Sequence, residues 1–305
     1  MNHAISSEPN RESCEPQRAI PATPEALLAA VLATNQPQDP RTREILDSLI
    51  RHLHAFAADV TLTYEELHKG LDFLVRVGQA TNPLRHEGIL LADILGVATL
   101  VLLMDAKGVL EAGGTEPALI GPFWRANQPI LENGAKIATD DTTGAPLRVT
   151  GRICSLDGRP LAGARLETWQ AAPSGLYENQ DPHQEDMNLR AVFVTDEDGR
   201  YWFESVKPAG YGVPIDGPCG DLLAMQQRSH MRPAHLHFIA SAPGHKVLTT
   251  QIFDANDPYA YRDAAFGAVG SLLRKFEASS DGTFHLDVQL TLEPGETRMP
   301  SPPLS

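Results

Sequence analysis

The stretch Met231–Ala240, MRPAHLHFIA, places His235 and His237 on either side of one leucine, in a chain with 11 histidines among 305 residues. A proline precedes the pair, large apolar residues follow it, and Pro243-Gly244 ends the run, which is typical of a short strand. Alternate side chains of a strand share a face, so both imidazoles would lie close enough to hold one metal ion. A half-buried strand whose histidines only satisfy hydrogen bonds fits the same stretch, and the stretch alone leaves both interpretations open.

A second His-Leu-His, in the segment RHLHAF, provides a control within the same chain. Residues two apart on a helix do not face each other, so His52 and His54 would diverge on a helix surface. The surrounding apolar residues recur at the three- and four-residue steps of an amphipathic helix: Ile45, Leu46, Leu49, Ile50, Leu53, Phe56 and Val60.

The composition excludes some classes of function. With 42% hydrophobic and 21% charged residues, the chain is typical of soluble globular proteins. A formal charge of −14 argues against a nucleic-acid partner, because phosphates attract basic surfaces. The cysteines, Cys14, Cys154 and Cys219, show neither zinc-site spacing nor a disulfide framework, so we expect a cytoplasmic location.

Two segments bear on targeting. Residues 1–22 are polar and lack the apolar core of a signal peptide, so we expect a mobile N-terminal arm. The most apolar run, residues 88–104, falls just short of a membrane span and contains Asp93. We therefore expect a buried helix and no membrane insertion. A carboxylate inside a buried helix is unfavourable, so the position of Asp93 has to be explained.

The pattern of the chain changes near residue 115. Residues 23–115 carry helix signals, such as Thr23-Pro24 and Asp39-Pro40 at helix starts and the capping-box spacing from Thr63 to Glu66. Residues 116–305 carry alternating apolar residues and tight turns such as Asp198-Gly199. These signals predict an α+β chain in which an N-terminal helical domain precedes an antiparallel β-sandwich or barrel.

A metal at His235 and His237 would need further ligands. Two histidines and one carboxylate around ferrous iron would be the usual set, yet carboxylates are too common in this acidic chain for one to stand out. Tyrosines are rarer, and Tyr177 and Tyr211 both follow glycine-containing loops, where the backbone can bend to present a side chain into a cavity. A loop tyrosine more often only packs its ring on the core, and spacing alone does not decide between these roles.

Longer motifs connect these residues to a known family. The segment GYGVPIDGP, followed by MRPAHLHFIASAPGHKVLTTQIF, closely resembles the intradiol ring-cleavage dioxygenases, which open catechols with non-haem ferric iron. The segment WQAAPSGLYEN is similar to the family's first tyrosine segment, and the resemblance extends from about residue 25 to residue 295. It implies that Tyr177, Tyr211, His235 and His237 bind Fe(III). Phenolates are hard anionic donors that favour the trivalent ion, so this ligand set is chemically reasonable.

The resemblance also implies the reaction and the site that performs it. Dioxygen would be inserted between the two hydroxylated carbons of a catechol-type ring, with Tyr211 leaving the iron to accept a substrate proton. Arg232 and Gln251 would support the chemistry, because a guanidinium can stabilise anionic ring character as it develops. The implied substrate pocket comprises Leu90, Asp93, Leu119, Ile120, Gly121, Pro122, Phe123, Val213, Pro214, Arg232 and Ala265.

Asp93 bears on which ring is cleaved. The hydroxyquinol branch of the family resembles this chain in having aspartate here, where the simple catechol enzymes have an apolar residue. A carboxylate can accept a hydrogen bond from a third ring hydroxyl, which favours hydroxyquinol (1,2,4-trihydroxybenzene) over catechol or chlorocatechol. Asp93 could instead pair with Arg85 or cap a backbone group. Two residues depart from the expected patterns: Trp124 matches neither branch, and Gly212 after the second tyrosine resembles the simple catechol enzymes more than the hydroxyquinol branch.

Two other functions fit parts of the sequence. A non-enzymatic ligand-binding sandwich and a ferrous extradiol enzyme are the rivals to an intradiol dioxygenase. The resemblance further implies a homodimer joined through the N-terminal helices, with an amphipathic lipid held between them.

Overall fold

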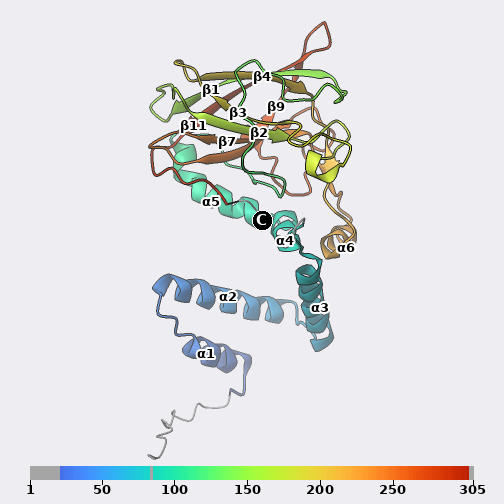
Figure 1. Ribbon diagram of the computed structural model, residues 1–305. Coiled ribbons are helices and arrows are strands. Elements are labelled where there is room, and N and C mark those ends of the chain that lie inside the picture. The colour runs from blue at the N-terminus through green and yellow to red at the C-terminus, as the bar shows by residue number, and fades with distance from the viewer. Residues whose placement is uncertain (1–20, 83–84, 302–305) are drawn as a thin grey trace, which may run out of the picture. The chain divides into compact units, whose positions relative to one another are not determined.

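A computed structural model describes residues 21–82 and 85–301 (Figure 1). The chain divides into two compact units, residues 1–71 and residues 72–305. The first contains α1 (Pro24–Thr34), α2 (Pro40–Asp59) and the start of α3 (Tyr64–Ala80). The expected mobile arm lies almost wholly outside the described residues.

The predicted helix starts are confirmed. The side chain of Thr23 accepts a hydrogen bond from the backbone of α1, and that of Asp39 does the same for α2. The Thr63 hydroxyl accepts from the Glu66 amide while the Glu66 carboxylate accepts from the Thr63 amide, which is the reciprocal capping box at α3. His52 and His54 lie within α2, where the geometry of a helix separates two residues at this spacing.

The apolar run at residues 88–104 forms two helices rather than one. It breaks between α4 (Glu87–Ile94) and α5 (Val97–Glu111), where Gly96 has a φ of 72°, and the two helices are bent by 70°. No single helix in the described ranges is long and apolar enough to cross a membrane, although this bent pair reaches the required length and composition. The expectation of one buried helix is wrong for α5, because Leu100, Val101 and Met104 are exposed.

The strands of the second unit form a sandwich of two sheets (Figure 1). One sheet has the order β10-β11-β1-β4 and the other β3-β2-β7-β8-β9, and β5 pairs with β6 in a separate ribbon. The bounds are β1 (Pro146–Ser155), β2 (Arg165–Gln170), β3 (Arg190–Val194), β4 (Arg200–Val206), β5 (Tyr211–Gly212), β6 (Met231–Arg232), β7 (His235–Ser241), β8 (Leu248–Asp254), β9 (Leu273–Arg274), β10 (Glu277–Ala278) and β11 (Phe284–Leu292).

The sandwich follows from the alternation in the sequence. Buried and exposed residues alternate along β1, β4 and β11, so this sheet has one apolar and one solvated face. Every residue of β7 is buried, which shows that the other sheet is covered on both faces. The sheets are mixed rather than purely antiparallel, since β1 pairs with β11, and β8 with β9, in parallel.

Candidate metal centre and substrate pocket

The two histidines of β7 lie on the side of their sheet that faces away from the sandwich core. Leu236 and Phe238 alternate with them and pack into the core between the sheets. His235 and His237 therefore point the other way, and both are buried. Trp169 stacks on the His237 ring, with ring centroids 4.5 Å apart and planes at 11°. The strand prediction for this stretch is confirmed, and the histidines face a cluster of aromatic side chains.

Tyr177 and Tyr211 reach the same point from two other segments. Tyr177 precedes the short 3-10 helix η1 (Glu178–Gln180), and Tyr211 begins β5. The Tyr177 hydroxyl lies 2.9 Å from Nε2 of His237 and 3.4 Å from the Tyr211 hydroxyl. Nε2 of His235 lies 3.1 Å from Nε2 of His237. The structure thus brings the phenol oxygens of two separate segments to the two imidazole nitrogens of β7.

The spacing of these donor atoms fits a bound metal. Metal–nitrogen and metal–oxygen bonds of about 2.0 to 2.2 Å place neighbouring ligands roughly 2.8 to 3.3 Å apart. Nδ1 of His235 lies 2.7 Å from the Pro233 carbonyl, so it carries the proton and Nε2 offers its lone pair to the cluster. The donor set is therefore suited to a hard, highly charged cation.

Burial sets the protonation of this cluster. It lowers the pKa of His235 to about 3, with a further contribution from Arg232, and it lowers the pKa of His237 strongly. Both imidazoles are therefore neutral and able to bind a metal. Burial, with the neighbouring Tyr211, raises the pKa of Tyr177. A phenolate at this position needs a cation beside it, because an isolated buried anion is costly.

The ferrous alternative needs a carboxylate beside the two histidines, and the described residues provide none. Across residues 21–82 and 85–301, no group of three histidine, cysteine, aspartate or glutamate side chains gathers at a point that could hold a metal ion. A two-histidine, one-carboxylate site is therefore not formed in the described part of the chain.

Two polar networks hold the Tyr177 segment in place. The Glu178 carboxylate accepts hydrogen bonds from Arg190 and Arg125, each at 2.6 Å, and Arg190 also donates to the Phe123 carbonyl. The Phe123 ring in turn stacks on Tyr177, with centroids 4.4 Å apart. Glu178 and Arg190 are both buried, so this ion pair joins the tyrosine segment to the wall of the neighbouring pocket.

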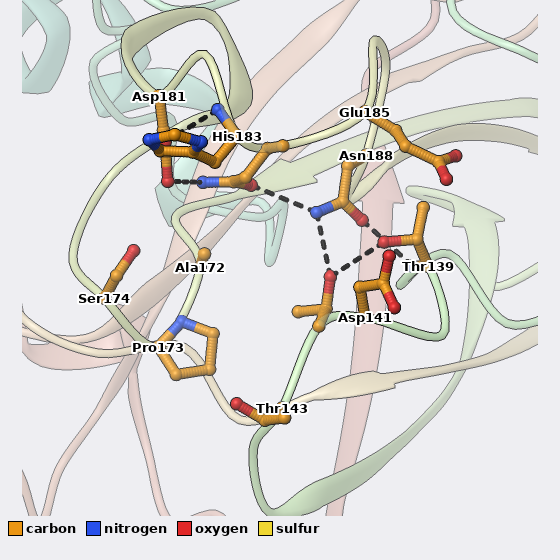
Figure 2. A pocket seen from close by; sticks show the side chains of 12 residues that line it. Thr139, Asp141, Thr143, Ala172, Pro173, Ser174, Asp181, His183, Glu185 and Asn188 are labelled. Carbon is orange, nitrogen blue, oxygen red and sulfur yellow. Dashed lines mark hydrogen bonds between the residues drawn. The ribbon is translucent and has the colours of Figure 1, made fainter.

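The second network surrounds a hollow whose wall includes residues just after η1, among them Asp181, Gln184 and Asn188. Figure 2 shows the hydrogen bonds that connect Asp181 and Asn188, through the Gln184 side chain, with Thr139. These bonds join residues 181–188 to the loop around Thr139. The chain after Tyr177 is therefore held at Glu178 by the first network and at Asn188 by the second.

A cavity of about 260 Å³ opens beside the four donors. Ten of the residues predicted for the substrate pocket line it: Leu90, Asp93, Leu119, Gly121, Pro122, Phe123, Val213, Pro214, Arg232 and Ala265. Tyr211 is also in its wall. Ile120 does not line it and packs instead against the aromatic cluster around Phe123 and Trp124. Lining residues that the sequence reasoning missed are Arg85, His86, Ile89, Gln180, Gly212 and Asp216.

Arg232 is a buried residue of this cavity. Its Nη2 donates to the Gln251 side-chain oxygen at 2.9 Å, and the Gln251 amide donates to the Leu119 carbonyl. Gln251 is therefore a bridge between Arg232 and the loop that contains Gly121 to Phe123. Asp263, which the sequence reasoning missed, binds the guanidinium from the other side through an ion pair at 3.0 Å. Because Arg232 is buried and ion-paired, it is not an ordinary surface arginine.

Asp93 is buried and unpaired. Arg85 forms its ion pairs with Glu87 and Asp216, not with Asp93. The Asp93 carboxylate has no hydrogen bond or ion pair within residues 21–82 and 85–301. Burial raises the pKa of this carboxyl to about 6, against the opposing attraction of Arg232. The carboxylate lies in the cavity wall, where a hydroxyl of a bound ligand could donate a hydrogen bond to it.

The two departures have structural reasons. The Trp124 indole donates to the Glu167 carboxylate at 2.9 Å, so it fixes the loop after Phe123 to β2. Gly212 lies against His230, whose ring would come within 2.4 Å of an added Cβ. A side chain at residue 212 would therefore displace the His230 ring beside Tyr211.

The fold and the site together define a class of protein: a β-sandwich in which two tyrosines and two histidines form a donor cluster beside a mostly apolar cavity. Comparison with known proteins agrees. The family described as "Dioxygenase" matches residues 119–293, and "Catechol dioxygenase N terminus" matches residues 39–113. The chain is 46% identical to a hydroxyquinol 1,2-dioxygenase of a Rhizobium species over 80% of this chain and 82% of that protein.

Two further relatives agree with this result. A 6-chlorohydroxyquinol 1,2-dioxygenase of Cupriavidus pinatubonensis is 42% identical over 83% of this chain and 91% of that protein. The crystal structure of a Pseudomonas putida hydroxyquinol 1,2-dioxygenase superimposes with a TM-score of 0.80 at 36% identity, covering 89% of this chain and all of that one. The chain belongs to the intradiol ring-cleavage dioxygenases. It is an oxidoreductase that incorporates dioxygen into an aromatic diol.

Proposed function

We propose that the chain binds Fe(III) through Tyr177, Tyr211, His235 and His237 and cleaves hydroxyquinol between its two adjacent hydroxylated carbons. The product would be 3-hydroxy-cis,cis-muconate, which tautomerises to maleylacetate. The observation that carries the substrate proposal is Asp93, a buried carboxylate without a partner in the cavity wall. A ring hydroxyl at the third position would supply the missing hydrogen bond.

Each proposed residue has a distinct task. Bound ferric iron would supply the electron-withdrawing centre that makes the ring diolate reactive toward dioxygen. Tyr211 lies in the cavity wall, so its phenol oxygen is placed to exchange a proton with an entering substrate hydroxyl. The buried Arg232 presents positive charge to the cavity, where it stabilises anionic character that develops on the ring.

The shape of the cavity supports a flat ring as the ligand. Leu119 and the Gly121–Phe123 segment form part of its wall, and Val213 and Pro214 form another part. Gly121 has a φ of 72° and an added Cβ would come within 3.2 Å of the His237 ring, so the backbone approaches the metal centre closely here. Apolar walls with a few polar groups are typical of sites for small aromatic ligands.

Oxygen uptake on two rings tests the substrate proposal. The wild-type protein, loaded with iron, is compared on hydroxyquinol and catechol, together with Asp93→Ala. We expect kcat/KM for hydroxyquinol to fall by about 100-fold in the variant, while that for catechol changes little, since only hydroxyquinol bonds to the carboxylate. If the variant and the wild type rank the two rings equally, the specificity proposal is wrong.

A catechol or chlorocatechol 1,2-dioxygenase is the alternative within the family, and the same assay identifies it through a higher kcat/KM for catechol. A non-catalytic ligand-binding sandwich would consume no oxygen with either ring.

We further propose that the helices of residues 23–115 mediate dimerisation and that residues 116–305 are the catalytic domain, in a cytoplasmic protein. Exposed apolar side chains support dimerisation through these helices. They are Leu100, Val101 and Met104 of α5 and Leu49, Leu53 and Phe56 of α2. A lipid between the subunits would cover some of these apolar side chains. Light scattering at micromolar concentration should give twice the chain mass, and a monomer would contradict the proposal.

A further inference from the structure

We infer that Asp263 is the positioning residue for Arg232: it holds the guanidinium so that one nitrogen, Nη1, is offered to the ring in the cavity. The inference deepens the proposed function and rests on it, because it gives Arg232 the task of stabilising charge on the substrate. Asp263 itself does not line the cavity.

The contacts of Arg232 leave one nitrogen without a partner. Nε donates to Oδ1 of Asp263 at 3.0 Å, and Nη2 donates to Oδ2 of Asp263 at 3.1 Å and to Gln251 at 2.9 Å. Among the described residues, nothing accepts a hydrogen bond from Nη1. The two carboxylate oxygens therefore fix the rotation of the planar guanidinium and determine which edge remains available.

The carboxylate that holds Arg232 is itself fixed by the backbone. Oδ1 accepts from the amide of Ala265 at 3.1 Å, and Oδ2 accepts from the amides of Gly267 and Ala268 at 2.9 and 3.1 Å. Asp263 is buried, and although burial acts against it, the attraction of Arg232 keeps the pKa of this carboxyl below its usual range. Asp263 is therefore an ionised, rigid support rather than a proton carrier.

Gly267 is the second part of the arrangement. An added Cβ at this position would lie 2.8 Å from Nη2 of Arg232 and 3.3 Å from Oδ2 of Asp263. The absence of a side chain lets the backbone lie directly against the ion pair. Alanine at this position would press on the guanidinium without removing the carboxylate.

The ion pair also affects Asp93. The positive charge of Arg232 lowers the pKa of the Asp93 carboxyl, whereas the negative charge of Asp263 raises it. The guanidinium therefore attracts two carboxylates, Asp263 and Asp93. Asp263 holds it by two hydrogen bonds, while Asp93 has none. Because the guanidinium is held by Asp263, it does not pair with Asp93. The Asp93 oxygens therefore stay available for a ring hydroxyl.

Steady-state oxygen uptake by the iron-loaded full-length chain tests the inference, with Asp263→Asn and Gly267→Ala as variants. An asparagine offers one oxygen instead of two, so Arg232 loses its fixed orientation. We expect kcat to fall by about 10- to 100-fold in each variant with KM within about 3-fold, because the interaction acts on the transition state. Asp254→Asn is the matched control: Asp254 is also buried and ion-paired, with Lys207 at 2.7 Å, and should keep kcat within about 2-fold.

A double-mutant cycle separates positioning from general structural support. In an Arg232→Gln background, Asp263→Asn should cost no more than about 2-fold further, since its effect passes through the guanidinium. Equal losses in both backgrounds, an unchanged kcat in Asp263→Asn, or an equal loss in Asp254→Asn would each overturn the inference. Wild-type protein that consumes oxygen with neither ring would instead refute the proposed function. If the wild type prefers catechol, the same kcat and KM values are measured with catechol, and the same outcomes decide the inference.

Discussion

Asp93 shows at the scale of one residue how stability and function oppose each other. It is a buried carboxyl with no partner in the described ranges, in a wall that is otherwise largely apolar. Its folded-state pKa of about 6 lies above the value of 3.8 for a free aspartate, so ionisation of this carboxyl is less favourable in the folded chain than in the unfolded chain. Groups that destabilise the free protein in this way are typical of sites that have a ligand to satisfy them.

Asp93→Asn should reveal this cost through pH. Because the folded pKa is raised, the wild-type carboxyl favours folding below about pH 4 and loses that contribution as pH rises toward about pH 6. The variant cannot ionise, so the difference in unfolding free energy should shift by roughly 3 kcal/mol in its favour between about pH 4 and pH 7.

Urea unfolding of both proteins at fixed iron loading measures this difference, with Asp105→Asn, on the exposed part of α5, as a control that should show no such trend. Curves for wild type and Asp93→Asn that stay parallel across the pH range would show that Asp93 is not a buried, unpaired acid.

At the scale of elements, the parallel pairing of β1 with β11 depends on a glycine. Gly151 lies opposite Val288 in this pair, and an added Cβ would come within 2.0 Å of the Val288 carbonyl and 2.4 Å of the Tyr201 hydroxyl. The Tyr201 hydroxyl donates to that same carbonyl at 2.8 Å. A side chain at residue 151 would therefore separate the two strands and break this buried hydrogen bond.

Gly151→Ala should lower the unfolding free energy by about 2 to 4 kcal/mol, because both neighbours are rigid and buried. Gly108→Ala is the matched control: Gly108 lies within α5 with nothing near its Cβ position, so alanine should raise stability by about 0.5 to 1 kcal/mol. Thermal unfolding of the pair checks both signs, and equal effects would contradict the strand geometry described here.

The sequence predicted local elements better than their pairing. Helix caps at Thr23 and Asp39 and the strand around His235 depend on neighbouring residues, so they could be read from the chain. The parallel pairing of β1 with β11 joins segments more than a hundred residues apart, and no local pattern encodes it. The break at Gly96 was missed because apolar residues continue on both sides of it.

The candidate site shows the same division. The two histidines could be grouped by strand periodicity, whereas the two tyrosines could be added only through the family resemblance. Asp263 was missed because its partner, Arg232, lies 31 positions away and aspartates are common in this chain. Ile120 adjoins residues that line the cavity, but its side chain packs against the aromatic cluster, a difference that sequence position alone could not reveal.

At the scale of the whole molecule, the sandwich acts as a rigid frame for a site built from several segments. The strand β7 supplies both histidines, the ribbon of β5 and β6 supplies Tyr211 and Arg232, and the segment before η1 supplies Tyr177. The helix α4 and the loop after residue 118 add the cavity wall. Loss of any one segment would therefore remove part of the proposed metal centre or of the neighbouring cavity.

The visible absorption spectrum of the purified, iron-loaded chain tests the central claim most directly. Phenolate bound to ferric iron should give a broad visible band and a red-brown colour, which Tyr177→Phe should weaken or abolish. Tyr201→Phe is the control, since Tyr201 is equally buried but donates to a backbone carbonyl far from the donors. A colourless wild-type protein, or a band that Tyr177→Phe leaves unchanged, would contradict an iron centre held by two tyrosines and two histidines.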